Sequence, residues 1–315
     1  MLDIIMPHYD EPWFVGKPFF DMLAMQKGID FSQIRVILVH DGKPGYAKKV
    51  FAEYPFKVDQ YSIDHGGVSA ARNYGIEKAT AEWITFCDFD DTYTNIYALK
   101  LIMESLDENY DLLWNPVYME DVKNGNMRIF PLEKFNMVFV HNKYIRREFL
   151  LSTGLKFNTD LQYAEDSAFL AILNIMLKQN KIGQIKTPEP LYVWAYRSGS
   201  CTTKRDNRPR NVRHLFEANK YISEEMERLG YKDAVLMKFR AVTDSYFSLT
   251  GEDAVDCDDL KKTVGEYWKE HRKEIGKADK GKLMQVYNAS LGNKKTGAKD
   301  EDRPTLAEWL EEVSK

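Results

Sequence analysis

The sequence has little cysteine and no long apolar run. Its three cysteines, Cys87, Cys201 and Cys257, are scattered without metal-site spacing, which argues against a disulfide framework and for a reducing compartment. No stretch reaches the roughly 18 apolar residues of a membrane span. The opening residues MLDIIMPHYD lack the charged start and apolar core of a signal peptide. These absences predict a cytoplasmic protein.

The chain also has little excess charge. A net charge of -4 over 315 residues gives no overall basic field, which argues against general nucleic-acid binding. Hydrophobic residues make up 44% and charged residues 29%, as in ordinary soluble globular proteins. The length suits one large domain with an appendage, or two domains.

Strand-like and helix-like segments alternate in the first half. Strands are expected at 2–6, 34–40, 57–63 and 83–87, and helices at 18–27, 46–54 and 68–79. This order predicts an α/β fold with a mostly parallel sheet and helices on both faces. Ligands of such sheets bind at the carboxyl ends of the strands. Pro7, Asp41, His65 and Asp88 follow strand ends and should therefore share one edge.

The later sequence turns from mixed to helical. Helices are expected at 97–106, 142–153 and 164–179, strands at 111–118 and 191–196, and a hairpin at Asn124-Gly125. Beyond residue 210 the expected elements are helices at 212–229, 234–249, 258–275 and 280–291, and a short capped helix at 305–313. We therefore predict an α/β domain over 1–205 and a helical appendage over 206–315.

The most informative segment is the acidic tip, residues 88–91, which reads Asp88-Phe89-Asp90-Asp91 directly after an apolar strand. Several carboxylates at one point of a sheet edge repel one another unless a cation lies there. Hard divalent cations take carboxylate oxygens and share them with substrate phosphates. The acidic tip therefore indicates an enzyme that uses a nucleotide-diphosphate compound; its other interpretation is a run of helix N-cap residues.

Three further charged features accompany the acidic tip. Asp41-Gly42 can accept a hydrogen bond from a base or ribose, although Asp-Gly after a strand is commonly a simple turn. Glu165-Asp166 opens a predicted helix, where carboxylates suit the helix dipole or provide a general base. Residues 197–213 are basic, and form either a solvated loop or a lid that neutralises a diphosphate or a polyanionic acceptor.

Five short motifs occur in order along residues 2–203. They are Pro7-His8-Tyr9-Asp10, His40-Asp41-Gly42, Gly67-x-Ser69-x-Ala71-Arg72-Asn73-x-Gly75, Asp88-Phe89-Asp90-Asp91 and Glu165-Asp166. Together they resemble the family-2 glycosyltransferases of GT-A fold. The resemblance implies a Rossmann-like sheet and an inverting, metal-dependent transfer from a nucleotide-diphosphate sugar, expected to be a UDP-sugar.

The same resemblance implies roles for single residues. In the nucleotide pocket it places Pro7, Tyr9, Asp41, Arg72 and Asp88. On the diphosphate it places Arg197, Ser200 and, through Mn²⁺ or Mg²⁺, the metal ligand Asp90. Asp166 would be the catalytic base. Two departures matter: His40 replaces a common second Asp, and no clear His follows the last strand, so water is expected to complete the metal shell.

The acceptor and the role of the helical part stay open. A surface glycan, wall polymer, glycolipid or hydroxylated DNA base would each offer a hydroxyl. The helical part would bind the acceptor, cover the sheet or mediate homo-oligomerisation. A nucleotidyltransferase is the alternative enzyme, but it would normally have a Gly-rich basic loop where this chain reads PHYDEPW. A non-catalytic sugar-nucleotide-binding module is the other alternative.

Overall fold

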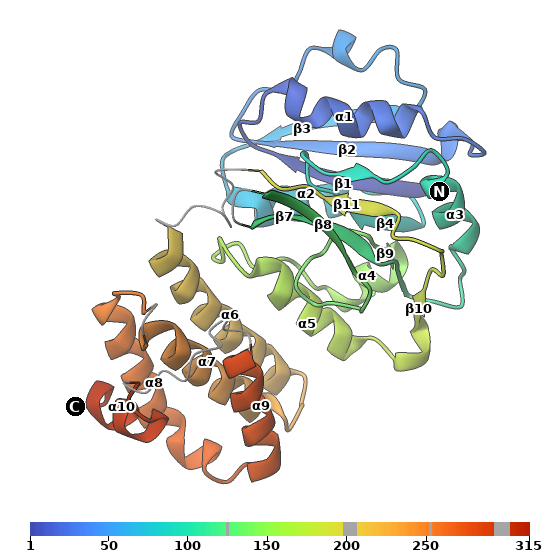
Figure 1. Ribbon diagram of the computed structural model, residues 1–315. Helices are drawn as coiled ribbons and strands as arrows, with labels where there is room; N and C mark the ends of the chain where they lie inside the picture. The colour runs from blue at the N-terminus through green and yellow to red at the C-terminus, as the bar shows by residue number, and fades with distance from the viewer. Residues whose placement is uncertain (124–125, 198–206, 252–253, 293–302) are drawn as a thin grey trace. The chain divides into compact units, whose positions relative to one another are not determined.

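The computed structural model describes residues 1–315 except 124–125, 198–206, 252–253 and 293–302 (Figure 1). The chain forms two compact units. The first contains Met1–Asp160 and Phe169–Ser198, and the second contains Leu161–Ala168 and Gly199–Lys315. The catalytic role predicted for 1–205 and the acceptor or oligomerisation role predicted for 206–315 stay predictions.

A seven-stranded sheet is the centre of the first unit, in the order β10-β6-β9-β4-β1-β2-β3. Its strands are β1 (Leu2–His8), β2 (Ile34–Asp41), β3 (Lys57–Ile63), β4 (Trp83–Phe86), β6 (Leu112–Trp114), β9 (Lys143–Arg146) and β10 (Ile182–Gln184). β1 runs parallel to β2 and β4, and only β9 runs antiparallel to its described neighbours. Apolar runs such as IRVILVH suit a sheet buried on both faces. The mostly parallel sheet is confirmed.

The strand register places the carboxyl ends of β1, β2 and β3 next to one another. His8 at the end of β1 lies beside His40 near the end of β2. β2 continues to Asp41, beside Ile63 of β3. We call this edge, where β1, β2, β3 and β4 end, the carboxyl edge. It carries the acidic tip.

A four-stranded sheet, in the order β5-β11-β7-β8, completes the strands of the first unit. They are β5 (Thr92–Tyr93), β7 (Val117–Lys123), β8 (Asn126–Leu132) and β11 (Tyr192–Trp194). β7 and β8 pair antiparallel as the hairpin motif predicts, while Asn124 and Gly125 themselves lie outside the described residues. β5 directly follows the acidic tip, so residues 88–91 do not cap a helix.

Five helices lie along the first part of the chain. They are α1 (Trp13–Ala24), α2 (Gly67–Lys78), α3 (Ala98–Ser105), α4 (Arg147–Thr153) and α5 (Glu165–Met176). Phe19, Phe20 and Leu23 of α1 are fully buried in the main core. On α2, a Cβ at Gly75 would meet Ile5 of β1 at 2.3 Å, so glycine lets this helix approach the strand closely. α2 is thereby fixed with its first turn at the carboxyl edge.

The second unit contains helices with their own core. They are α6 (Arg208–Arg228), α7 (Ala234–Leu249), α8 (Asp258–Ile275), α9 (Lys280–Gly292) and α10 (Leu306–Val313). Phe216, Val242 and Leu260 are buried together with Trp309 of α10. The predicted cap of the last helix is confirmed, because Thr305 and Glu308 form a reciprocal capping box.

Three predicted elements are wrong. Residues 46–54 contain only a 3-10 turn at Lys48–Val50, because the backbone of Tyr46 pairs with the Gln60 amide instead of entering a helix. The strand expected at 111–118 divides into β6 and β7 at Asn115-Pro116, since proline has no N–H for a sheet ladder. The helix expected at 142–153 begins as strand β9 and becomes helical only at Arg147.

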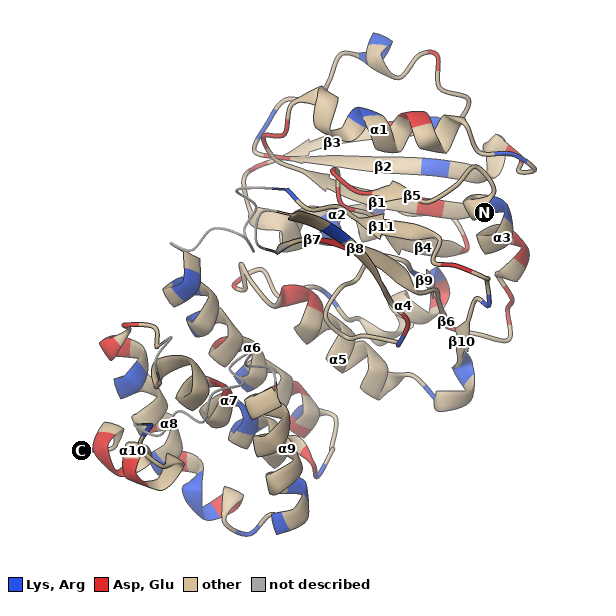
Figure 2. Cartoon of the chain, viewed as in Figure 1, with Lys and Arg blue, Asp and Glu red and all other residues tan. Residues whose placement is uncertain are grey.

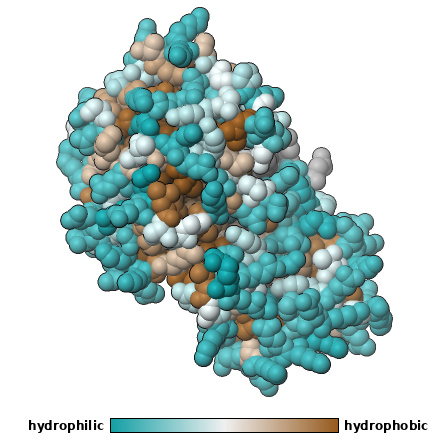
Figure 3. All heavy atoms as spheres, turned by 180° about the vertical axis from the view of Figure 1, so that it is seen from behind, coloured by the Kyte–Doolittle hydropathy of each residue, from teal (hydrophilic) through white to brown (hydrophobic). Residues whose placement is uncertain are grey.

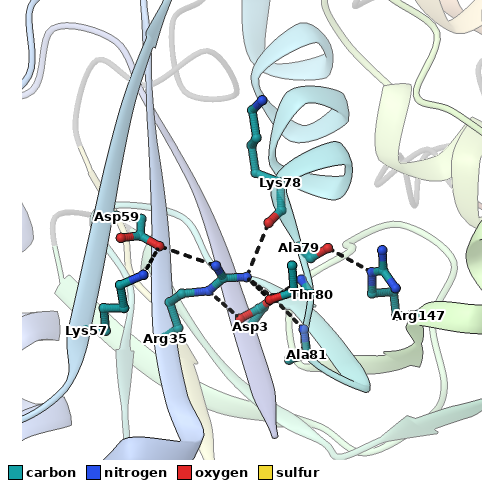
Figure 4. Close-up of polar contacts among 9 residues, drawn as sticks. All are labelled: Asp3, Arg35, Lys57, Asp59, Lys78, Ala79, Thr80, Ala81 and Arg147. Atoms are coloured by element: carbon teal, nitrogen blue, oxygen red, sulfur yellow. Dashed lines mark hydrogen bonds and ion pairs between the residues drawn. The ribbon is translucent and has the colours of Figure 1, made fainter.

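The amino-terminal ends of the strands carry a charged network far from the carboxyl edge (Figure 4). Arg35 of β2 donates to both oxygens of the buried Asp3 carboxylate, at 2.8 and 2.5 Å. The backbone N–H groups of Thr80 and Ala81 donate to Asp3 as well. Burial raises the pKa of Asp3, but these hydrogen bonds outweigh it and leave that pKa lowered.

Replacement of Arg35 by methionine is expected to destabilise the protein by about 3 kcal/mol, because it leaves the Asp3 carboxylate buried without its cation. Lys57→Met is the control, since Lys57 forms a more exposed pair with Asp59 and should cost less than about 1 kcal/mol. Urea unfolding measures both. Because the folded pKa of Asp3 is lowered, its stabilisation exists at neutral pH and disappears as pH falls through that pKa. Equal losses for the two variants would contradict this account.

Charges of both signs are spread over the described surface. Figure 2 shows acidic and basic residues along the helices of both units. α8 begins with Asp258 and Asp259 and ends with Arg272 and Lys273, which matches the helix dipole. Figure 3 shows one face on which hydrophilic atoms predominate and hydrophobic atoms form separate patches. None of the described helices is long and apolar enough to cross a membrane.

Candidate active site at the carboxyl edge

Asp41 ties the end of β2 to the start of α2. Its buried carboxylate accepts the backbone N–H groups of Gly66 at 2.7 Å and Gly67 at 3.0 Å, and lies 2.8 Å from His65 Nδ1. These bonds satisfy N–H groups at the helix entrance that have no partner within the helix. In this structure Asp41 therefore holds the loop before α2. Its predicted contact with a nucleotide would use lone pairs that these bonds leave.

Tyr9 presents an aromatic face beside this loop. Its ring is 46% exposed and lies 4.8 Å from the His65 ring, with Lys43 Nζ 5.1 Å from the Tyr9 centroid. Pro7 lies two residues earlier, in β1, and is half-buried. An exposed ring with a nearby ammonium suits stacking of a base and attraction of phosphate. The structure brings Tyr9 and the Asp41–His65 pair together as the sequence predicts.

Arg72 of α2 contacts the acidic tip through Asp88. Its guanidinium is buried, donates to Asp88 Oδ1 at 3.1 Å and lies 5.4 Å from the Phe157 ring centroid. Asp88 itself remains one-third exposed. Arg72 thus supports Asp88 while leaving part of that carboxylate accessible to a ligand.

The next residue, Asn73, has a different partner. Its side-chain amide donates to the Phe157 carbonyl at 2.9 Å and accepts the Phe157 N–H at 2.8 Å. This two-way pairing resembles one rung of a sheet. It fixes the segment that leads toward α5.

Arg197 lies between two carboxylates. Its Nε donates to Asp90 Oδ2 at 2.7 Å and a terminal nitrogen donates to Glu11 Oε1 at 3.1 Å. Burial raises the pKa of Asp90, the Asp88 charge adds to this, and Arg197 opposes it. Burial alone would lower the pKa of Arg197, but Asp90 and Glu11 raise it. A guanidinium therefore supplies positive charge where the sequence predicts a metal and a diphosphate.

Asp91 faces inward. Its oxygens accept the Tyr192 hydroxyl at 2.7 Å and the Ala195 N–H at 2.9 Å. Burial raises the pKa of Asp91 well above its usual range, and the charges of Asp88 and Asp90 add to that rise. Asp91 ties the acidic tip to β11 and the segment that follows it.

His141 completes a cluster that can accept a metal ion. One ligand atom each from Asp88, Asp91 and His141 lies within 4.8 Å of the other two. Burial lowers the pKa of His141 to about 3, so its ring is neutral, and its Nε2 has no hydrogen-bond partner among the described atoms. Ligands about 2.1 Å from one ion lie within about 4.2 Å of each other. These three residues could therefore hold a metal ion if their ligand atoms moved slightly closer together.

Two predicted site residues do not enter this geometry. Asp166 lies in the first turn of α5, within the segment Leu161–Ala168 that belongs to the second unit. Ser200 lies outside the described residues. Their roles stay predictions.

A model of the family described as Glycosyl transferase family 2 matches residues 3–170, more than half of the chain. The chain belongs to this family. The predicted membership, and with it the glycosyltransferase assignment at the level of the family, is confirmed. The GT-A fold is confirmed as well, by the likeness to S. aureus TarS 1-349, solved in complex with UDP-GlcNAc, at a TM-score of 0.52 and 16% identity over 93% of this chain and 92% of that one.

Curated relatives match over shorter spans. The uncharacterized glycosyltransferase EpsJ of Bacillus subtilis is 27% identical over 192 residues, which are 54% of each chain. The minor teichoic acid biosynthesis protein GgaB of the same organism is 26% identical over 199 residues, 56% of this chain and 21% of GgaB. This family-2 chain thus spans about half the length of EpsJ and a fifth of GgaB.

Two members of the site escaped the sequence prediction. Glu11 stands in the loop read only as acidic and aromatic, and its contact with Arg197 spans 186 positions. His141 lies two residues before β9, a strand that the helical pattern of 142–153 concealed. A correct strand assignment there would have placed His141 at a strand start beside β4, and so near the acidic tip.

Proposed function

We propose that this family-2 chain is a metal-dependent inverting glycosyltransferase that moves a sugar from a UDP-sugar to an acceptor hydroxyl. The observation that carries the proposal is the acidic tip at the carboxyl edge, flanked by Arg72 and Arg197. Parallel α/β sheets bind ligands at this edge. The UDP-GlcNAc named with TarS supports UDP as the nucleotide.

The donor's nucleoside would bind at the start of α2. Tyr9 offers its exposed ring to the base, and Pro7 and Asp41 shape the pocket beneath it. Asp88 would accept a ribose hydroxyl while Arg72 holds its other side. These residues fix the nucleoside so that its diphosphate reaches the acidic tip.

Binding of the diphosphate would change the hydrogen-bond partners of Arg197. Arg197 would turn from Asp90 toward the phosphates, because its forked donors match phosphate oxygens, and Ser200 would add a hydroxyl. Asp90 is then available to a divalent ion, for which the Asp88–Asp91–His141 cluster is the alternative holder. Bound Mn²⁺ or Mg²⁺ would neutralise the charge of the departing nucleotide.

Asp166 would accept the proton of the acceptor hydroxyl as its oxygen attacks the anomeric carbon. A single displacement of this kind inverts that carbon. Asp166 lies in the first turn of α5, where the helix dipole favours a carboxylate. GgaB is a minor teichoic acid biosynthesis protein, which favours a wall polymer as the acceptor. Other glycans, glycolipids and hydroxylated DNA bases are the alternative acceptors.

The test is a thermal-stability screen of nucleotide-diphosphate sugars with and without Mn²⁺, followed by donor hydrolysis. UDP-sugars are expected to raise the melting temperature only with the metal, because binding to the folded state alone stabilises it. GDP- and CDP-sugars are the controls. Failure of every nucleotide sugar to stabilise the protein would end the proposal, and stabilisation without any hydrolysis or transfer would favour a binding module.

A further inference from the structure

The second unit carries a groove between α8 and α10, with Phe239 of α7 in its lining (Figure 1). Its volume is about 810 Å³, and ligand sites commonly measure about 300–1,000 Å³. Every lining residue belongs to the second unit, and none is a predicted donor-site residue. The groove is therefore a feature that the proposed donor chemistry does not use.

Helix packing fixes the walls of this groove. A Cβ at Gly265 of α8 would meet the Val313 carbonyl oxygen at 1.9 Å, so glycine lets the end of α10 lie close to α8. Phe239 and Leu310 are 9% and 5% exposed, so buried side chains form part of the lining. The groove is thus formed by the folded helices themselves.

Trp268 of α8 gives the groove an aromatic surface. Its side chain packs against the core of the second unit and stays partly exposed. Because the face of an aromatic ring carries negative potential, it attracts the C–H groups of a sugar ring. Glu311 of α10 also lines the groove and is exposed, and its carboxylate oxygens can accept hydrogen bonds from sugar hydroxyls. These two side chains suit a sugar ligand.

Two cations of α8 line the same groove. Lys269 and Arg272 are both exposed, and their spacing of three positions places them on one face of the helix. Neither forms an ion pair with a carboxylate among the described residues, whereas Lys261 of the same helix pairs with Asp258 at 2.9 Å. With two cations against the single carboxylate of Glu311, the lining favours an anionic ligand.

Ser314, which follows α10, adds a polar group to the lining. Its Oγ is buried and has no hydrogen-bond partner among the described atoms. A hydroxyl buried without a partner is unfavourable, and a change of rotamer would turn it into the groove to pair with a ligand oxygen. This hydroxyl favours a polar occupant over the apolar face of a partner helix, which is the other ligand that helical grooves accept.

We propose that this groove binds a phosphate-bearing glycan, with Trp268 against a sugar ring and with Lys269 and Arg272 on the phosphate groups. Arg272 suits phosphate because its forked donors match two phosphate oxygens. The proposal rests on the proposed function, in which a wall polymer is the favoured acceptor, and it narrows that acceptor to a polymer with charged groups. The second unit thereby holds the acceptor chain at a place other than the donor site.

The first test is calorimetry of the full chain without donor or metal. The probe is teichoic acid, a polymer of sugar and phosphate, with dextran as the neutral glycan and polyphosphate as the sugar-free anion. Teichoic acid should bind, and its affinity should fall as salt is raised. Absence of that binding overturns the proposal. Equal binding of dextran would remove the role of the cations, and equal binding of polyphosphate would remove the sugar contact, so either result overturns it too.

Variants place the binding in the groove. Arg272→Gln and Lys269→Gln should each weaken teichoic acid binding about tenfold, as expected for one hydrogen bond between charged groups. Lys273→Gln is the matched control, because Lys273 shares the last turn of α8 with Arg272 but does not line the groove. Trp268→Leu should abolish binding, and the two exposed positions decide the matter if this variant fails to fold.

Two outcomes of the variant series would overturn the proposal. An equal loss in Lys273→Gln would show general attraction of a polyanion to basic residues. A change in self-association of Arg272→Gln, measured by sedimentation, with unchanged teichoic acid binding would make the groove a contact between copies of the chain.

A kinetic measurement separates this proposal from the proposed function. Arg272→Gln should raise the KM for teichoic acid about tenfold, in line with the lost hydrogen bond, and leave UDP-sugar hydrolysis unchanged. Hydrolysis of the donor by a chain that binds no charged glycan keeps the proposed function and overturns the groove. Groove-dependent binding by a chain that no nucleotide sugar stabilises keeps the binding site and overturns the proposed function.

Discussion

Asp90→Asn is expected to lower sugar transfer about 1,000-fold and to abolish its dependence on Mn²⁺, because the neutral amide no longer supports the ion that offsets charge on the leaving nucleotide. Asp90 is the carboxylate of the acidic tip that forms an ion pair with the partly exposed Arg197. The substitution also removes one of the two carboxylate charges that Arg197 contacts, so the affinity for UDP without metal should hold or rise. Initial rates against Mn²⁺ concentration, with UDP calorimetry, measure both effects.

His141→Gln is the matched comparison, since it removes the neutral ring of the Asp88–Asp91–His141 cluster and leaves Asp90 intact. If Asp90 holds the ion, this variant should change the apparent affinity for Mn²⁺ by roughly threefold at most. Loss of a residue that supports a metal ligand typically costs about 10-fold to 100-fold in metal affinity. The reverse pattern, with metal dependence lost in His141→Gln and retained in Asp90→Asn, would move the metal to the cluster.

Asp166→Asn should separate donor binding from chemistry. UDP-sugar affinity is expected to stay within about twofold, while the turnover number falls about 100-fold to 10,000-fold, the range contributed by a general base. Glu165→Gln, one position earlier in the first turn of α5, is the control and should keep most of the activity. Calorimetry and single-turnover transfer give the two quantities.

Equal loss of donor affinity and turnover in Asp166→Asn would contradict the assignment of Asp166 as the base. Unchanged turnover would do the same and would direct the search to another carboxylate. The anomeric configuration of the product, read by proton NMR, tests inversion independently of both variants.

The sequence predicted β2 and β4 because they are largely apolar runs. β3 was placed at its observed bounds, and the helical bounds of α7 and α8 also agree. The errors fall where tertiary contacts override local pattern. Tyr46 belongs to a polar network with Gln60, and residues 143–146 fill a gap between β4 and β6 that no local signal reveals.

The site was predictable to the extent that motifs carry it. The structure unites Asp41, Arg72 and Asp88 at one edge, as the motif order implies. Partners distant in sequence were not predictable. Glu11, His141 and the His8–His40 contact depend on strand register, which a single sequence does not specify.

The pairing of Asn73 with the backbone of Phe157 bears on any attempt to redesign this protein. Neighbouring positions of α2 have two different partners: Arg72 contacts Asp88 of the proposed donor site, and Asn73 holds the backbone segment that leads toward α5. Exchange of the motif Gly67–Gly75 as a single block is therefore expected to disturb the backbone at Phe157 as well. Grafts would need to carry residues 155–159 along with it.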